Sequence, residues 1–367
     1  MRQNMSLAPL YMLMVVGLYI KMTNQLLIKK IEESGLTGRG GGAFSVAKKW
    51  KLVKKNIDNS NFGYIIVNAA EGEPEVKKDG YLLENETELV IAGINQALLY
   101  LGAKNIKAIY FYLNVLYLQK YKAKIEKVLK NKEYKELAKK IIFYKKPQES
   151  GYIGGEESAI VNVIGGQKVR PSQRPPFPPE VGLFAKPTLI NNVESFYNVA
   201  LIAKGTYDNK RLFTLAGACS HKGVYNLSAT MSIADILHAT DNYPDFPFFV
   251  IAGGAVCGEV LDQDQLIAGV EGSGLIMIFN HQKTDYDKLL DFWLRFYENQ
   301  SCGLCTPCRE GSYRLRELFK EKKIKTEKFT DLLDNLEQST FCALGSSLPY
   351  TVKSYLENIY FKYKKYE

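Results

Sequence analysis

Three of the six cysteines of this chain fall within seven residues, at Cys302, Cys305 and Cys308. The C-x2-C-x2-C spacing lets the thiolates of one turning loop reach separate corners of a compact iron–sulfur cluster. A fourth cysteine, Cys342, follows 34 positions later and must come from a different structural element. We therefore predict that Cys302, Cys305, Cys308 and Cys342 are the metal ligands of one [4Fe–4S] cluster.

The spacing alone leaves two other uses of these cysteines open. Structural zinc sites usually combine two separated pairs of ligands, and disulfide frameworks are typical of short secreted chains rather than one of 367 residues. We expect Pro307 to keep the cysteine run from continuing as regular helix. Cys219 and Cys257 have no partner at ligand spacing, and we interpret them as plain core or loop cysteines.

The length predicts two or three domains. The net charge of +9 reflects lysines scattered through stretches such as 120–140 and 318–328. We interpret them as solvated faces and expect no nucleic-acid binding, because no base-reading motif accompanies the charge. A basic surface suits phosphate-bearing cofactors and acidic partner subunits. The thiols indicate a reducing compartment, so we expect a cytoplasmic protein.

Residues 1–22 form a hydrophobic N-terminal extension. Its apolar part, 8–20, is short for a membrane span, and no small-residue cleavage site follows it. It is either an anchor or packing segment or a stretch translated from upstream of a natural start at Met22, and we favour the second. We expect membrane contact only through a larger complex.

Residues 23–208 alternate between helical and β-rich patterns, which predicts a doubly wound, Rossmann-like parallel sheet. The expected strands are 64–70, 106–113 and 141–144. The expected helices are 23–34, 46–54, 81–101 and 119–140.

Two glycine-containing loops in this region are candidate ligand sites. Five of the ten residues in 35–44 are glycine, so backbone N–H groups there can close around a phosphate or a flat ring, with Arg39 adding charge. Glu71 and Glu73 follow the strand 64–70, where ligand groups gather in α/β sheets. The alternatives are a flexible connector for the first loop and an exposed acidic turn for the second.

Three further stretches carry polar or charged side chains that could bind a ligand. Gly154-Gly155 precedes Glu156 and Glu157 in the first turn of an expected helix, where capping alone could also explain the acids. Five of the thirteen prolines fall within 171–179, around Arg174 and Phe177. That loop suits stacking on a base, although it could be a linker. The amides of 191–192 can bond flavin or ribityl oxygens, or form an Asx-type turn.

In the remaining chain the sequence pattern changes twice, first to short alternating strands and then to helices. Alternating strands at 211–217 and 223–227, a short helix at 230–239 and a strand at 248–254 predict a small β-grasp (SLBB, ubiquitin-like) domain over 209–284. Residues 285–367 are expected to be a helical iron–sulfur domain, with helices at 285–300, 309–323, 326–339 and 347–365. The cysteine run joins the first two helices and Cys342 the last two, which would bring all four thiolates to one end of a four-helix unit.

Together these motifs resemble the flavin-bearing, NADH-oxidising F subunit of complex I (NADH:quinone oxidoreductase) and its relatives in NAD(P)-linked hydrogenases and formate dehydrogenases. The resemblance covers roughly 23–365 and keeps the family's order of motifs. The motifs are Gly38–Gly41, Glu71–Pro74, Tyr152–Glu157, Pro175–Pro178, Lys186–Thr188 with Asn191–Glu194, and Ser301–Gly311 with Cys342–Gly345.

The resemblance implies FMN and a [4Fe–4S] cluster as cofactors and NADH as substrate. The implied FMN contacts are Gly38, Arg39, Gly40, Gly41, Gly42, Lys49, Asn68, Glu71, Tyr152, Gly155, Glu156, Asn191 and Asn192. The implied NADH contacts are Phe44, Glu73, Glu157, Arg174 and Phe177. The implied partners are a thioredoxin-like [2Fe–2S] subunit and a larger iron–sulfur subunit of the same complex.

The implied activity is hydride transfer from NADH to FMN, then single electrons to the cluster and onward to the partners' iron–sulfur centres. No general base is needed, so no catalytic side chain is assigned. The sequence departs from the family at Ala70 (usually Asp), Leu52 (commonly aromatic), Gly154 (usually Cys) and Arg174 (usually Lys). A scaffold subunit that keeps the fold and cluster but has lost NADH oxidation is the alternative, motivated by Ala70, Leu52 and Ser45. Membership of a hydrogenase rather than complex I is a second alternative.

Overall fold

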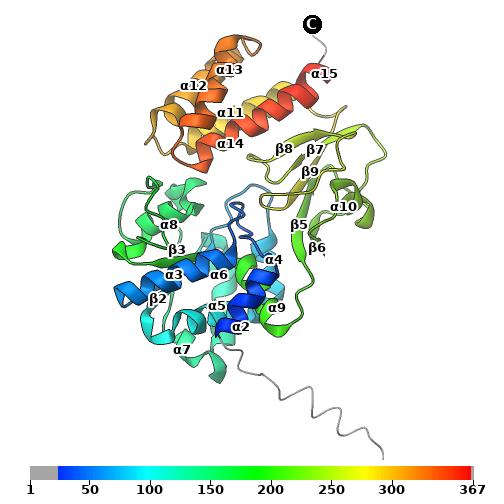
Figure 1. Ribbon diagram of the computed structural model, residues 1–367. Helices are drawn as coiled ribbons and strands as arrows, with labels where there is room; N and C mark the ends of the chain where they lie inside the picture. Colours follow the sequence, from blue (N-terminus) through cyan, green and yellow to red (C-terminus); the bar gives the residue numbers. More distant parts are fainter. Residues whose placement is uncertain (1–23, 365–367) are drawn as a thin grey trace, which may run out of the picture.

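The computed structural model describes residues 24–364, so the predicted N-terminal extension lies outside the described residues. Figure 1 shows three parts: a parallel-sheet part (residues 24–204), a mixed-sheet part (210–280) and a helical bundle (286–363). The bundle lies at the top of this view and the parallel-sheet part lies below it. The mixed-sheet part lies at the right, beside the parallel-sheet part and under the C-terminal end of the bundle.

The parallel sheet has four strands in the order β3-β2-β1-β4. They are β1 (Gly63–Ala69), β2 (Ile106–Leu113), β3 (Ile141–Lys145) and β4 (Thr188–Asn192), and all neighbouring pairs are parallel. The three strands expected from the sequence are confirmed to within a residue or two. β4 is an addition to that expectation, because its five residues are followed at once by a helix cap and give no long apolar run.

Helices cover both faces of this sheet, as expected of a doubly wound arrangement. Ile65 and Val67 of β1 pack into the core formed with α2 (Asn24–Glu33), α3 (Val46–Ser60), α5 (Thr87–Leu101), α6 (Val115–Leu129) and α9 (Val193–Lys204). Tyr64 and Ile66, which alternate with them, pack against α8 (Glu157–Ile164) on the other face. Because both faces are buried, β1 reads as a continuous apolar run.

Two of the expected helices are each broken in the structure. The stretch 81–101, expected as one helix, forms α4 (Lys78–Asn85) and α5, with Glu86 outside helical geometry at φ −128°. On either side of this break, the start of α4 bonds to Glu71 just beyond β1, while α5 packs closely on α9 at Gly93. In the stretch 119–140, also expected as one helix, α6 begins earlier and ends at Leu129, and the 3-10 turn Lys132–Tyr134 and the short α7 (Lys135–Ala138) follow.

The start of α6 and the start of the turn that follows it have a local cause. The Asn114 side chain accepts a 2.9 Å hydrogen bond from the Tyr117 N–H, which caps the helix at its true start. Asn131 caps the following turn in the same way, through the Glu133 N–H at 3.1 Å. Asparagine caps thus set the start of α6 and the start of the turn that follows it, and the helical periodicity used in the prediction does not report them.

The mixed-sheet part has five strands in the order β6-β5-β9-β7-β8, with β5 and β9 parallel and the other pairs antiparallel. They are β5 (Lys210–Gly217), β6 (Gly223–Ser228), β7 (Phe248–Ala252), β8 (Glu259–Asp262) and β9 (Leu275–Asn280). α10 (Ile233–Ala239) covers one face together with Phe248 and Val250. Phe249 and Ile251 point to the other face, which packs on the bundle.

The bundle consists of α11 (Tyr286–Gln300), α12 (Thr306–Lys320), α13 (Glu327–Ser339) and α14 (Ala343–Tyr355), continued by a π-turn at Leu356–Tyr360 and by α15 (Phe361–Tyr363). α12 and α14 begin earlier than the expected 309 and 347. Pro307 does not hold the chain out of a helix as we expected; it lies in the first turn of α12. A proline is favourable there, since the first N–H groups of a helix have no partner within it.

Within the described part of the chain, we find no helix long and apolar enough to cross a membrane.

Candidate functional site

The parallel sheet reverses its strand order between β1 and β4. The chain builds β2 and β3 on one side of β1 and then places β4 on the other, with Asn68 in register with Asn192. Ligands of open α/β sheets bind at such a switch point, outside the carboxyl ends of the strands. The switch-point crevice is defined here by the carboxyl ends of β1 and β4 and the loops 38–44, 70–74 and 152–157.

The predicted glycine loop lies against β4 and the start of α9. Its ends are joined by the Gly38 N–H, which donates to the Phe44 carbonyl at 2.8 Å. The Arg39 N–H donates to Ser195 Oγ at 3.0 Å, and a Cβ on Gly40 would lie 3.3 Å from the Cβ of Asn192. The loop therefore lies at a helix N-terminus, where backbone N–H groups and the helix dipole favour a bound anion.

Two polar atoms in this crevice are buried without a hydrogen-bond partner in the structure. They are Arg39 Nε and Asn191 Oδ1. An unmade hydrogen bond of a buried group costs about 1–3 kcal/mol, so both atoms point to a polar ligand. Asn192 already has partners: its oxygen accepts from the Glu194 N–H at 2.9 Å and caps α9, and its amide nitrogen contacts Asp79.

A buried ionic network that sequence reasoning missed supports this end of the crevice. Lys78 Nζ lies 2.9 Å from Asp79 Oδ1 and 3.1 Å from Glu194 Oε2. Burial opposes the charge of Lys78, but the two carboxylates outweigh it and raise the pKa of the amine. Glu194 also accepts from the Leu212 N–H at 3.1 Å, which ties the mixed-sheet part to the crevice. The only signal in the sequence is the adjacent Lys-Asp pair, which does not reveal the burial of either side chain.

Glu71 is turned toward α4 and α6. Its carboxylate accepts hydrogen bonds from the Asp79 N–H at 2.8 Å, the Gly80 N–H at 3.1 Å and the Tyr117 hydroxyl. Burial, reinforced by the charge of Asp79, raises the pKa of Glu71 to about 7. This carboxyl group can therefore change its protonation state near neutral pH.

Glu73 joins the crevice to the mixed-sheet part. It accepts hydrogen bonds from the Tyr152 hydroxyl at 2.6 Å and the Val256 N–H at 3.0 Å, and Cys257 Sγ lies 3.5 Å away. Burial raises the pKa of Glu73. Cys257 lies in the turn between the strands ending at 252 and beginning at 259, as expected of a loop cysteine, and it is also part of this contact. Its partners lie more than a hundred positions away, so sequence spacing gives no signal.

The two acids of the second pair, Glu156 and Glu157, have different partners. Glu156 caps α8 through the Ala159 N–H at 2.9 Å and pairs with Arg174, whose guanidinium lies 5.7 Å from the centroid of the Phe177 ring. Glu157 instead pairs with Lys49 at 2.6 Å. Phe44 and Phe177 are 50 % and 46 % exposed, which leaves both rings free to stack on a ligand.

Lys49, Asn68 and Gly155 complete the set of predicted contacts. Lys49 Nζ also donates to the Ile190 carbonyl at 3.1 Å, beside the end of β4. The Asn68 amide donates to the Gly155 carbonyl at 3.0 Å, which joins β1 to the turn before α8. The structure thus links loops that are far apart in the sequence through direct contacts.

The four predicted cluster ligands lie around the starts of α12 and α14. Cys302 and Cys305 precede α12, Cys308 lies in its first turn, and Cys342 directly precedes α14 at the N-cap position. All four are free thiols. Burial raises the pKa of Cys308 and raises that of Cys342 to about 11, while N–H groups at the start of α14 act against this shift at Cys342. The N–H groups at the start of α14 favour a thiolate at Cys342, but burial outweighs them, so both sulfurs are protonated thiols at neutral pH.

In residues 24–364 no group of three or more His, Cys, Asp or Glu side chains is arranged around a point that could hold a single metal ion. A four-iron cluster makes a different demand, because each thiolate binds its own iron at a separate corner.

Two regions of the chain match known protein families. Residues 31–201 match the family described as the Nuo51 FMN-binding domain, and residues 288–366 match the NADH-ubiquinone oxidoreductase-F iron-sulfur binding region. The F subunit of NADH-quinone oxidoreductase from Buchnera aphidicola is 31 % identical, over 85 % of this chain and 78 % of the relative. The chain belongs to the family of NADH-quinone oxidoreductase F subunits.

Other relatives support this assignment. The F subunit of the Aquifex aeolicus enzyme is 28 % identical over 95 % of this chain and 87 % of its own length. An NAD+-reducing [NiFe]-hydrogenase in the H2-reduced state has a chain of similar fold, with a TM-score of 0.82 and 25 % identity over 92 % of this chain. This chain spans 61 % of that hydrogenase chain. The Aquifex and Buchnera relatives are named as subunits of NADH-quinone oxidoreductase.

FMN and a [4Fe–4S] cluster are the cofactors of the two matched regions, and the residues present fit both. For FMN, the fit rests on the glycine loop at the start of α9 and on the unpartnered Arg39 Nε and Asn191 Oδ1. For the cluster, it rests on four free cysteines at two adjoining helix N-termini, a donor set that soft iron–sulfur centres prefer.

The structure shows the surroundings of three positions at which this sequence differs from the family pattern. Ala70 is buried beside Gly155, so no carboxylate points into the crevice at that position. Ser45 caps α3 through the Lys48 N–H. A Cβ on Gly154 would lie 2.3 Å from Ser150 Oγ, so the larger residue of the family does not fit this local conformation.

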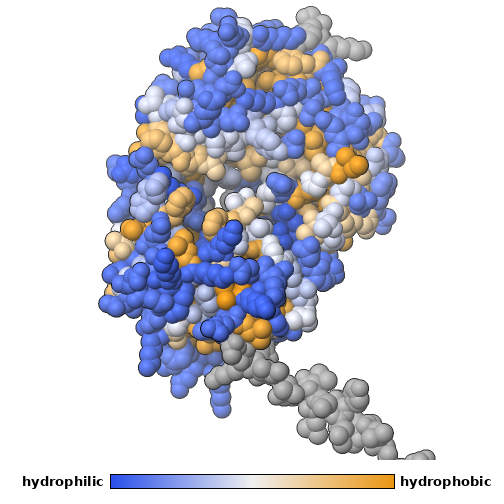
Figure 2. Space-filling view, viewed as in Figure 1, coloured by the Kyte–Doolittle hydropathy of each residue, from blue (hydrophilic) through white to orange (hydrophobic). Residues whose placement is uncertain are grey.

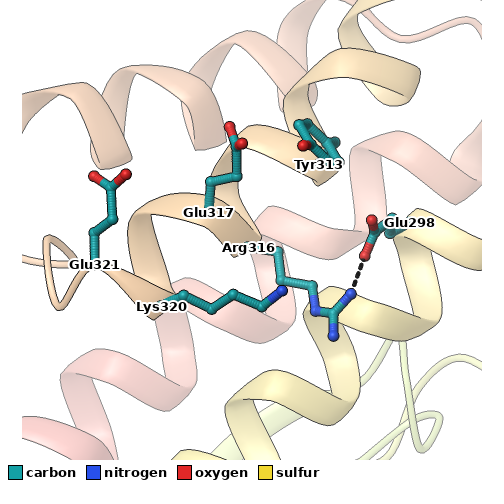
Figure 3. A pocket seen from close by; sticks show the side chains of 6 residues that line it. All are labelled: Glu298, Tyr313, Arg316, Glu317, Lys320 and Glu321. Atoms are coloured by element: carbon teal, nitrogen blue, oxygen red, sulfur yellow. Dashed lines mark hydrogen bonds and ion pairs between the residues drawn. The ribbon is translucent and has the colours of Figure 1, made fainter.

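Figure 3 shows a separate surface hollow on the bundle. It has a volume of about 240 Å³ and is lined by Glu298, Tyr313, Arg316, Glu317, Lys320 and Glu321, with Arg316 paired to Glu298 at 2.6 Å. It shares no residue with the crevice or the cysteine site. Figure 2 shows a different hollow, near the centre of the visible face, between the parallel-sheet part and the bundle.

Proposed function

We propose that this chain is the NADH-oxidising flavin subunit of a multisubunit oxidoreductase. The observation that carries the proposal is the joining, in one chain, of a glycine loop at the β1/β4 switch point with four cysteines at the starts of α12 and α14. The first arrangement suits a flavin phosphate and ring, and the second suits an iron–sulfur cluster. Both lie in regions that match the family of F subunits.

The proposal divides the chain as the sequence suggested. Residues 23–208 would bind FMN and NADH, 209–284 would be an SLBB β-grasp domain, and 285–367 would carry the cluster. The mixed sheet with its central parallel pair β5–β9 and one covering helix supports the β-grasp assignment.

Bound FMN would accept hydride from NADH and release electrons singly to a [4Fe–4S] cluster. The protein's part is to orient the two ring systems and keep water out. The glycine loop, Arg39 and the start of α9 would hold the phosphate, while Asn68, Asn191 and Asn192 would bond the polar edge of the flavin. Phe44 and Phe177 would stack on the nicotinamide and adenine of NADH, with Arg174 adding charge.

The remaining predicted contact residues would line the crevice or hold its loops in place. Lys49, Gly155 and Glu156 would line the flavin side, and Glu157 the NADH side. Tyr152 and Glu73 would fix the loop that separates the crevice from the mixed-sheet part. Cys302, Cys305, Cys308 and Cys342 would hold the cluster. Partners would be a [2Fe–2S] thioredoxin-like subunit and a larger iron–sulfur subunit, placing the chain in a peripheral arm on the cytoplasmic side.

An anaerobic absorption spectrum of the FMN- and iron–sulfur-reconstituted chain, taken before and after NADH, tests this function. We expect flavin bands and a broad iron–sulfur shoulder that both bleach with NADH. Iron–sulfur absorption that NADH leaves unchanged would instead indicate a scaffold subunit, and a colourless protein with stoichiometric zinc would overturn both interpretations.

A second candidate is the corresponding flavin subunit of an NAD-linked hydrogenase. The similarity to the NAD+-reducing [NiFe]-hydrogenase chain favours it. Co-purification of the chain from its native source decides between them, since a nickel-containing partner would indicate the hydrogenase.

A further inference from the structure

Lys146 is a buried cation that the proposed chemistry does not yet use. It directly follows β3, and its N–H donates to the Leu113 carbonyl at 2.7 Å, which fixes it at the carboxyl edge of the sheet. The residue is 9 % exposed. The structure gives its amine no carboxylate and no hydrogen-bond acceptor among residues 24–364. Burial lowers the pKa of Lys146 to about 8.

The side chain passes between two loops of the switch-point crevice. A Cβ on Gly154 would lie 3.1 Å from Lys146 Cε, and a Cβ on Gly72 would lie 3.5 Å from Lys146 Nζ. Both neighbours are glycines, and the space that side chains there would fill is left to the lysine. The amine therefore ends beside Gly72 of the loop 70–74.

The nearby carboxylates, Glu71 and Glu73, are hydrogen-bonded to other groups. Glu71 is bonded to the N–H groups of residues 79 and 80 and to Tyr117. Glu73 is bonded to Tyr152 and to the Val256 N–H. The Lys146 side chain is mostly buried and its amine has no opposite charge beside it, so a ligand that brings negative charge to this point would stabilise the ammonium.

The two ends of the crevice differ in what they can bind. The glycine loop, Arg39 and the start of α9 lie at β4, which suits a phosphate. Lys146 lies at the end of β3, the opposite edge strand of the same sheet. A ligand whose phosphate lies at β4 would present its other end to Lys146. In FMN that end is the ring, which gains negative charge when it is reduced.

We propose that Lys146 is a further cofactor-binding residue, which meets the flavin ring and stabilises the negative charge of its reduced form. This inference rests on the proposed function, since it requires FMN in the crevice. Charge near the flavin ring nitrogens is one of the ways in which a protein tunes this cofactor. Gly154 belongs to the same arrangement, because a side chain there would displace Ser150 and crowd Lys146.

The test compares the affinities of oxidised and reduced FMN for the full iron–sulfur-reconstituted chain, by anaerobic titration. In Lys146→Met we expect affinity for reduced FMN to fall about tenfold more than affinity for oxidised FMN. For a two-electron couple this corresponds to a fall of about 30 mV in midpoint potential. The matched control is Lys145→Met, an exposed neighbour on β3, which should leave the ratio of affinities unchanged.

Equal loss of both affinities, or no loss in a folded variant, would overturn the role of Lys146 while leaving the proposed function intact. Lys146→Gln, which keeps a polar group in the same space, provides the same measurement if the methionine variant does not fold. Failure of the unsubstituted chain to bind any FMN would overturn the proposed function and this inference together.

Discussion

The Tyr152 hydroxyl donates a 2.6 Å hydrogen bond to Glu73, although the two residues lie 79 positions apart. The same carboxylate accepts from the Val256 N–H, and the Val256 carbonyl in turn accepts from Tyr297 of α11 at 2.8 Å and from Thr351 of α14 at 3.0 Å. One short loop thus connects the switch-point crevice with the helical bundle that holds the four cysteines.

We expect Tyr152→Phe to destabilise the chain by about 1.5–3 kcal/mol, because it removes one donor from a buried carboxylate. Urea unfolding measures the loss. Tyr81→Phe on α4, whose side chain is partly exposed, serves as the control and should change stability little. Equal stability of the two variants would mean that Tyr152 does not secure Glu73.

The raised pKa of Glu71 predicts a pH-dependent stability. The folded state holds the proton more tightly than the unfolded state, so this group's stabilising contribution is complete below pH 4.5 and is lost as the pH rises to about 7. Over this pH range the free energy of unfolding falls by about 3 kcal/mol because of Glu71. Glu71→Gln should flatten this part of the profile in unfolding experiments without cofactor, whereas Glu75→Gln, an exposed change on the same loop, should not.

Lys78→Met should destabilise the chain by about 3–5 kcal/mol, because it leaves Asp79 and Glu194 buried without their cation. Lys77→Met is a matched control, since the neighbouring lysine is exposed. The measurement is the midpoint of urea unfolding for both variants. A loss no larger than that of the control would argue against an ionic network at this site.

Cys342→Ala should abolish the iron–sulfur absorption and the bound iron while FMN binding persists, because one corner of the cluster loses its ligand. Cys219→Ala, in the mixed-sheet part, should keep both cofactors. Iron content and the visible spectrum after reconstitution check this prediction. Full iron retention in the Cys342 variant would remove that cysteine from the ligand set.

Gly93→Ala should destabilise the chain by about 3 kcal/mol, since the new Cβ would lie 1.8 Å from the backbone carbonyl oxygen of Phe196 and force α5 away from α9. Leu99→Ala, at an exposed position of the same helix, is the control. Thermal unfolding of both variants provides the comparison, and an unchanged midpoint for Gly93→Ala would show that the two helices can separate without cost.

The sequence by itself determined what depends on near neighbours in the chain. The cysteine spacing predicted the ligand set, the glycine content of 35–44 predicted a loop that can approach a ligand, and alternating patterns predicted most strands and helices. These features are local, because backbone freedom, helix periodicity and cluster ligation each act over a few residues.

The tertiary structure alone decided which distant groups meet. The breaks at Glu86 and after Leu129, the strand β4, the place of Cys257 beside Glu73 and the burial of Lys146 and Lys78 all depend on packing between elements. A buried carboxylate takes its partner from whatever chain segment the fold brings near. Sequence separation carries no information about that choice, so Tyr152 and Val256 could be assigned to Glu73 only in three dimensions.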